Sequence, residues 1–164
     1  MKGAGPAQDV RRGELFDPSR FAKKRGHSVP GQGQKVKKKE QAIQLLSITE
    51  NKNELVADFI IEAILENLQI KRELFQHLES INTSDSIFAT NTSSIPITQI
   101  ASGLHHPERL VGVHFFNPAH IMKLVEVIKG ATTSDIVAEK AFNWSISLGK
   151  TTVYAQDAPG FIVN

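Results

Sequence analysis

Short apolar runs recur along the chain, and each of them predicts a strand. In DFIIEA, SIFATN and RLVGVHFF the central positions are continuously apolar, which is typical of strands that are buried on both faces of a sheet. Polar and turn-forming residues separate the runs. The predicted strands are 47–50, 58–63, 86–91, 109–116, 123–128 and 151–155.

Helical periodicity occupies most of the intervals between these runs. Ile70, Leu74, Leu78 and Ile81 recur at three or four residues, as expected of one apolar helix face. Proline at a helix start and glycine at a helix end mark further boundaries. The predicted helices are 35–46, 51–56, 66–80, 96–103 and 133–148.

Strands that alternate with helices predict an α/β fold with a mainly parallel sheet and flanking helices. Ligands of such sheets bind beyond the carboxyl ends of the strands. This rule directs attention to three loops, 62–67, 90–94 and 114–118. No internal repeat is visible in the sequence.

The second of these loops contains four small polar residues in a row, Asn-Thr-Ser-Ser at 91–94. Such residues commonly cap a helix or close a turn. They could equally form a polar floor for a substrate oxygen or a cofactor amide. The residues alone leave both interpretations open.

A histidine and a glutamate lie in two consecutive apolar strands. Glu126 alternates with Leu124 and Ile128, so it is expected to share their buried face and to need a partner. If the two strands are neighbours, His114 is a candidate partner. An imidazole held by a carboxylate is a general acid/base unit, although a structural ion pair would have the same pattern.

Charge divides the chain into two parts. Residues 1–39 contain eleven Lys or Arg against three acids, whereas residues 40–164 contain eight against fourteen. Residues 1–34 are also rich in glycine and proline, so we interpret them as a basic, disordered arm. A solvated arm is a simpler interpretation than one that contacts phosphates, and we do not expect a nucleic-acid partner.

Several classes of protein are excluded by composition. No apolar run is long enough for a membrane span, and the first residues lack the apolar core of a signal peptide, so a cytoplasmic location is expected. The chain contains no cysteine and no histidine pair with metal-ligand spacing, so we predict no metal site.

A dinucleotide site requires glycines directly between a strand and a helix, where backbone amides can approach the pyrophosphate. Gly31 and Gly33 are separated by one residue, but Pro30 precedes them and no apolar run leads into them. We therefore interpret them as ordinary loop glycines. The phosphate-binding loop is the main feature that this sequence lacks.

Four motifs in order resemble the 3-hydroxyacyl-CoA dehydrogenases, which are NAD-dependent oxidoreductases of fatty-acid metabolism. The resemblance covers residues from about 47 to 164 and implies a Rossmann-like cofactor-binding domain. The motifs are EAILENLQIKRELF, ATNTSSIPITQIA, PERLVGVHFFNPAHIMKLVEVIKG and LGKTTVYAQDAPGFIVN.

The resemblance also implies roles for individual residues. His114 would be the catalytic base that takes the proton of the substrate 3-hydroxyl, and Glu126 its carboxylate partner. Ser93 would bind the substrate oxygen and contact the cofactor, and Asn164 would complete the catalytic site. The implied cofactor contacts near the nicotinamide ribose are Glu66, Lys71 and Ser93.

Two departures from the family pattern accompany these matches. The first βαβ unit, with its glycine-rich loop, is missing or replaced, and no helical domain follows PGFIVN. We therefore predict a partial NAD-binding domain over 35–164, whose activity alone is in doubt. An acyl-CoA is the implied substrate. A non-catalytic remnant or binding module, associating through an exposed sheet edge or with a companion domain, is the alternative.

Overall fold

The computed structural model describes residues 40–162 of the chain. The predicted basic arm at 1–34, the predicted helix start at Lys35 and the candidate residue Asn164 lie outside this range. Within it, no helix is long and apolar enough to cross a membrane.

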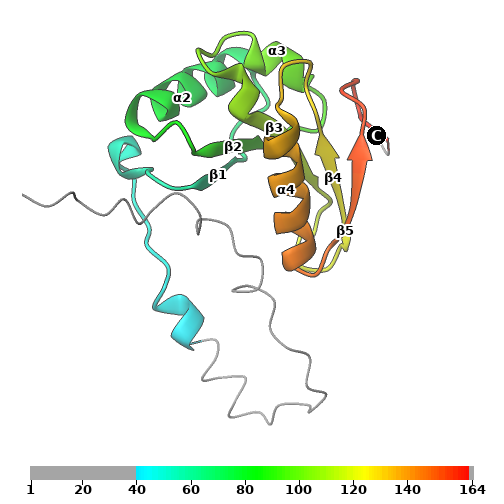
Figure 1. Cartoon of the computed structure of the whole chain (residues 1–164). Helices are drawn as coiled ribbons and strands as arrows, with labels where there is room; N and C mark the ends of the chain where they lie inside the picture. The colour runs from blue at the N-terminus through cyan, green and yellow to red at the C-terminus, as the bar shows by residue number, and fades with distance from the viewer. Residues whose placement is uncertain (1–39, 163–164) are drawn as a thin grey trace, which may run out of the picture.

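Five strands form one sheet in the order β1-β2-β3-β4-β5 (Figure 1). β1, β2 and β3 run parallel, β4 is antiparallel to β3, and β5 is parallel to β4. The prediction of an α/β fold with a mainly parallel sheet is therefore confirmed. The strands are β1 (Phe59–Glu62), β2 (Ile87–Thr90), β3 (Leu110–Phe115), β4 (Leu124–Ile128) and β5 (Thr151–Ala155).

The direction of each strand follows from the length of its connection. A crossover between parallel strands needs a dozen or more residues and usually contains a helix. Residues 116–123 are too few for this, so β4 returns antiparallel to β3. A helix connects β4 to β5, and these two strands are parallel.

Helices cover both faces of the sheet. The helical elements are η2 (Lys52–Glu54), α2 (Leu68–Ile81), α3 (Ile97–Ala101), η3 (Pro107–Arg109) and α4 (Asp135–Ser147). α2 and α3 pack on one face, against Phe88 and Leu110, while α4 packs on the other, against Ala89 and Val111 (Figure 1). Consecutive strand residues therefore enter different cores, which explains the continuous apolar runs.

α2 begins at Leu68, two residues after the predicted start at Glu66, because the side chain of Asn67 accepts a hydrogen bond from Ile70 N and caps the helix. Its buried residues differ from the predicted stripe. Phe75 and Leu78 are fully buried, whereas Ile70 is exposed. The helix is therefore rotated towards Phe75, which contacts Phe88 of β2.

The segment before β1 is less regular than predicted. The strand predicted at 47–50 is wrong: these residues are irregular, and Ile48 is 98% exposed. Of the helix predicted over 35–46, the described part is helical only at 40–43. The Asn51 cap is present, but the helix that it starts is the single 3₁₀ turn of η2.

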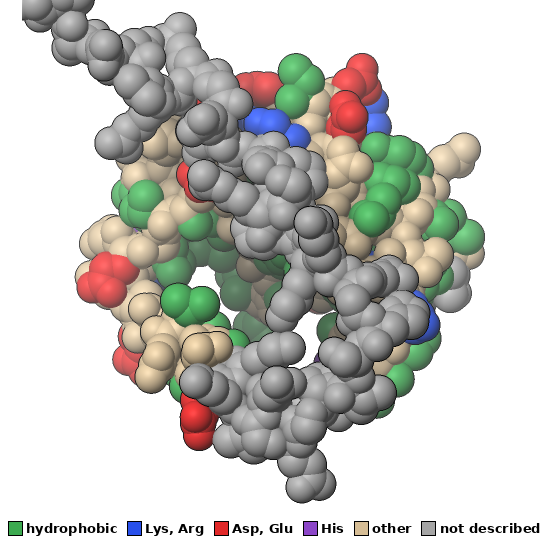
Figure 2. All heavy atoms as spheres, turned by 60° about the horizontal axis from the view of Figure 1, so that its bottom comes forward, with side chains coloured by type: hydrophobic (Ala, Val, Ile, Leu, Met, Phe, Trp, Pro, Cys, Tyr) green, Lys and Arg blue, Asp and Glu red, His purple; other side chains and the backbone are tan. Residues whose placement is uncertain are grey.

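The face of this unit that Figure 2 shows has no uniform character where it is not covered by grey atoms. Figure 2 shows acidic side chains (red) at several separate places on one face, with apolar side chains (green) between them. The acidic side chains agree with the excess of Asp and Glu in residues 40–164.

Candidate active site

His114 and Glu126 face each other across β3 and β4. They are direct partners in the antiparallel register, and His114 Nδ1 lies 2.8 Å from Glu126 Oε2. Both are buried, with exposed fractions of 4% and 0%. The structure therefore brings together the two residues that the sequence placed in consecutive apolar strands.

Hydrogen bonds and aromatic rings surround the pair of His114 and Glu126. Glu126 also accepts a hydrogen bond from Ile162 N at 3.1 Å, so both carboxylate oxygens are bound. The rings of Phe116 and Phe161 pack against the imidazole, with centroids at 4.7 and 5.6 Å. Glu126 engages Nδ1, so Nε2 is the ring nitrogen that has no hydrogen-bond partner among the described residues.

A second polar cluster lies at the carboxyl ends of β1 and β2. Glu66 accepts hydrogen bonds from the hydroxyls of Thr92 and Ser94 and from the backbone N of Ser93 and Ser94. Lys71 Nζ lies 3.3 Å from its other oxygen. Burial alone raises the pKa of Glu66, but these hydrogen bonds and the Lys71 charge outweigh it and lower the pKa to about 2.

In the 91–94 loop, the side chains of Asn91, Thr92 and Ser94 bind other protein groups, as the interpretation of the loop as a cap or turn expects. Thr92 and Ser94 bind Glu66, and the hydroxyl of Thr92 also accepts from Ile95 N, as turn residues do. The side chain of Asn91 accepts from Phe115 N at 2.8 Å. Ser93 is exposed, and it is the member of the loop whose hydroxyl binds no described residue.

Lys71 is buried rather than exposed. Its ammonium donates to Glu62 Oε1 at 2.7 Å, and its exposed fraction is 1%. Glu62 in turn accepts from Thr90 Oγ1 and from Ile64 N, each at 2.6 Å. Of the three residues that the family resemblance assigned to the cofactor, Ser93 is exposed, Glu66 has a side chain that is 40% exposed, and Lys71 is buried.

Asn91 connects the two clusters. Its backbone N donates to Glu62 O at the end of β1, and its side chain binds the residue that follows His114 in β3. Glu62, Thr90 and His114 therefore lie at the same end of three parallel strands, where α/β sheets bind ligands. Sequence analysis did not single out Glu62 or Asn91 as individual residues.

Glu66 and Ser93 fit one part of a dinucleotide site, the part that contacts the cofactor near the strand ends. Glu66 and Ser93 offer hydrogen-bonding groups near the strand ends. The loop at 63–67, which follows β1, contains no glycine, and between residues 40 and 162 no strand leads through a glycine-rich loop into a helix. No group of three or more metal-ligating side chains occurs in this range either.

Comparison with known families identifies the family to which the chain belongs. A family model described as "3-hydroxyacyl-CoA dehydrogenase, NAD binding domain" matches residues 18–158. The chain belongs to this family. The match begins well before residue 47, where the resemblance was expected to begin.

Curated 3-hydroxyacyl-CoA dehydrogenases are similar to the chain over much of its length. The 3-hydroxybutyryl-CoA dehydrogenase of Clostridioides difficile is 43% identical over 127 residues, which are 77% of this chain and 45% of that protein. The mitochondrial hydroxyacyl-coenzyme A dehydrogenase of Mus musculus is 43% identical over 147 residues, which are 88% and 46%. The chain thus spans less than half the length of these relatives.

Solved structures of the family share the fold. The (S)-3-hydroxybutyryl-CoA dehydrogenase from Ralstonia eutropha has a TM-score of 0.76 and 35% identity, covering 79% of this chain and 46% of that chain. The 3-hydroxybutyryl-CoA dehydrogenase from Escherichia coli K12 has a TM-score of 0.72 and 35% identity, covering 89% and 30%. The predicted Rossmann-like character of the sheet is therefore confirmed.

Proposed function

We propose that this chain is the partial cofactor domain of an enzyme that interconverts 3-hydroxyacyl-CoA and 3-oxoacyl-CoA with NAD. The observation that carries the proposal is the buried contact of 2.8 Å between His114 and Glu126 at the ligand-binding end of the sheet. In this proposal residues 35–164 form the partial domain.

His114 is the proton-transfer residue of the proposed reaction. Its Nε2 accepts the proton of the substrate 3-hydroxyl as the C3–H bond breaks. Glu126 fixes the tautomer through Nδ1 and stabilises the imidazolium that forms. Bound NAD would supply the acceptor for the hydride that leaves C3.

Ser93 and Asn164 are the proposed positioning groups for the substrate oxygen. The hydroxyl of Ser93 is exposed, while its neighbours Thr92 and Ser94 hold the loop through Glu66. A fixed donor on a tethered loop aligns the reacting hydroxyl with the base, which is a contribution of proximity and orientation. The role of Asn164 rests on its place in PGFIVN.

Glu66 and Ser93 are the proposed contacts to the nicotinamide ribose. A carboxylate with a pKa of about 2 stays ionised throughout the neutral range and can accept from ribose hydroxyls. Lys71 was assigned a direct contact by resemblance. Its burial favours a supporting role instead, in which its ammonium holds Glu66 in place and charged.

The alternative function is that of a non-catalytic remnant or binding module. One observation favours it: among the described strands β1 pairs only with β2, and Leu65 just beyond it is 73% exposed. An unpaired edge of this kind can pair with another strand, from a companion domain or another chain.

The cytoplasmic location remains a prediction, and the mouse relative is named as mitochondrial.

A titration of the chain with NADH separates the two functions. Trp144 is half-buried against Phe59, with ring centroids 4.7 Å apart, and can act as the energy-transfer donor. Saturable binding supports the cofactor domain and calls for assays with a 3-oxoacyl-CoA. Absence of binding up to about 1 mM NADH, which bounds the affinity at roughly −4 kcal/mol, supports the remnant.

A further inference from the structure

Asp157, in the turn after β5, holds the start of a helix that lies 60 residues earlier in the chain. One carboxylate oxygen accepts from Ile97 N at 2.6 Å, and the other accepts from Thr98 N at 2.8 Å and from Thr98 Oγ1 at 2.5 Å. The N-cap residue of α3 is Pro96, whose side chain makes no capping bond. Asp157 therefore supplies the cap from a distance.

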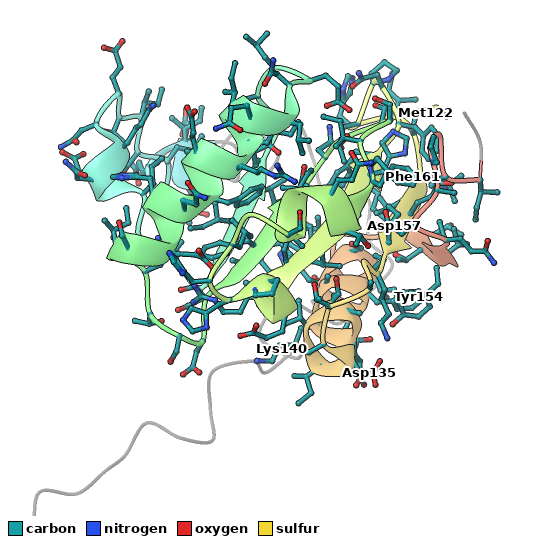
Figure 3. The ribbon with its side chains drawn as sticks, turned by 90° about the horizontal axis from the view of Figure 1, so that it is seen from above. Met122, Asp135, Lys140, Tyr154, Asp157 and Phe161 are labelled. Atoms are coloured by element: carbon teal, nitrogen blue, oxygen red, sulfur yellow. The ribbon has the colours of Figure 1, made fainter. Side chains whose placement is uncertain are left out.

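This cap ties the last described segment to the loop that carries Ser93. α3 begins directly after residues 91–96, so the amides that Asp157 binds are the first to follow the polar loop. Figure 3 shows Asp157 and Phe161 on the same side of the molecule, with Asp157 between Tyr154 and Phe161.

The other end of the same segment meets the His114–Glu126 pair. Gly160 and Phe161 have φ angles of 81° and 53°, so two consecutive residues adopt the left-handed conformation. This reversal places the ring of Phe161 5.6 Å from the imidazole and directs Ile162 N to Glu126 Oε1. A bulky residue at positive φ is strained and persists only where its surroundings hold it.

We propose that Asp157 is a positioning residue for the acid/base pair. It anchors one end of residues 157–162, so that Phe161 covers the imidazole of His114 and Ile162 N binds the carboxylate of Glu126. Asp157 acts through these two residues and contacts neither His114 nor Glu126. The catalytic meaning of this arrangement rests on the proposed function, but the arrangement itself can be tested without any turnover.

Ser134 offers a matched control. It also caps a helix, since its hydroxyl accepts from Val137 N at the start of α4, but it has no bond to the pair or to residues 157–162. Loss of either cap should weaken the fold. Only loss of the Asp157 cap should disturb His114.

The test uses NMR of the full 164-residue chain as wild type, D157A, D157N and S134A. In D157A we expect the imidazole signals of His114 to move, through loss of the Phe161 ring, and the Ile162 amide to exchange roughly tenfold faster. In S134A we expect a lower melting temperature with both signals unchanged. D157N keeps the size of the side chain and one accepting oxygen, so an intermediate shift is expected.

Two results would overturn the proposal. One is a folded D157A whose His114 and Ile162 signals coincide with those of the wild type. If D157A does not fold, a D157N with unchanged signals has the same effect. Neither result bears on NADH binding or on proton transfer by His114, so failure here is distinguishable from failure of the proposed function.

Discussion

Glu62 and Lys71 bind each other inside the protein at 2.7 Å, with side-chain exposed fractions of 0% and 1%. Glu62 ends β1 and Lys71 lies in the first turns of α2, so the contact fixes the helix to the strand end that it follows. Thr90 extends the contact to β2. Two buried charges are tolerated because each has a partner and further hydrogen bonds.

Removing the ammonium group of Lys71 should therefore destabilise the fold strongly. K71M leaves the Glu62 carboxylate buried without its cation, so we expect a loss of about 3 kcal/mol or more in the free energy of unfolding, measured by urea denaturation. K129A is the control, because it breaks the exposed pair with Asp135 and should cost far less than K71M. Equal losses in the two variants would show that Lys71 does not stabilise the interior.

Glu66 should make stability depend on pH in the acid range. Its pKa falls from 4.5 to about 2 on folding, so its contribution is complete above about pH 4.5 and is lost as pH falls towards 2. Because the side chain is 40% exposed, solvent screening limits this contribution to about 1 kcal/mol. The difference in urea midpoint between wild type and E66Q should thus be present at about pH 6 and shrink towards about pH 2. An equal difference at both pH values would contradict the hydrogen-bonded carboxylate.

Proton transfer by His114 predicts a selective loss of turnover. Any oxidation of NADH by a 3-oxoacyl-CoA should fall at least about 100-fold in H114A, while the affinity for NADH stays unchanged. H120A is the control, since His120 lies on the exposed connection between β3 and β4. Retained turnover in H114A would exclude the assignment of His114 as the base.

The proposed domain boundary predicts that residues 1–34 contribute little to the fold. Deleting them should change the free energy of unfolding of the remaining chain by less than about 0.5 kcal/mol, as for other changes outside a core. Thermal melting followed by circular dichroism measures this. A large loss would mean that part of the arm packs onto residues 40–162, and the family match from residue 18 makes that outcome informative.

Sequence patterns were sufficient to predict a strand where it packs between two layers of helices. The runs that became β2 and β3 are apolar at both alternating sets of positions because helices cover both faces, and this leaves a continuous signal. Residues 47–50 carry a much weaker pattern, because Ile48 is their single apolar residue. They have no neighbouring strand within 40–162 to pair with, so local preference alone did not make them a strand.

The long-range polar contacts could not be predicted in the same way. The pairing of His114 with Glu126 could be predicted, because the alternation of apolar residues placed Glu126 on a buried face of the next strand in the sequence. The partners of Asp157 lie 59 and 60 residues away, and those of Asn91 depend on where three strands end. No periodicity in a single segment encodes such contacts, because they arise only when the segments pack.

The reversal of direction between β3 and β4 has a consequence for how the site assembles. His114 and Glu126 are only 12 residues apart in sequence, so a short connection brings them together at a small cost in loop-closure entropy. Contacts this local form readily and depend little on distant parts of a chain. Under the proposed function, the proton-transfer unit can therefore assemble within β3, β4 and their connection, independently of the segments that precede β3.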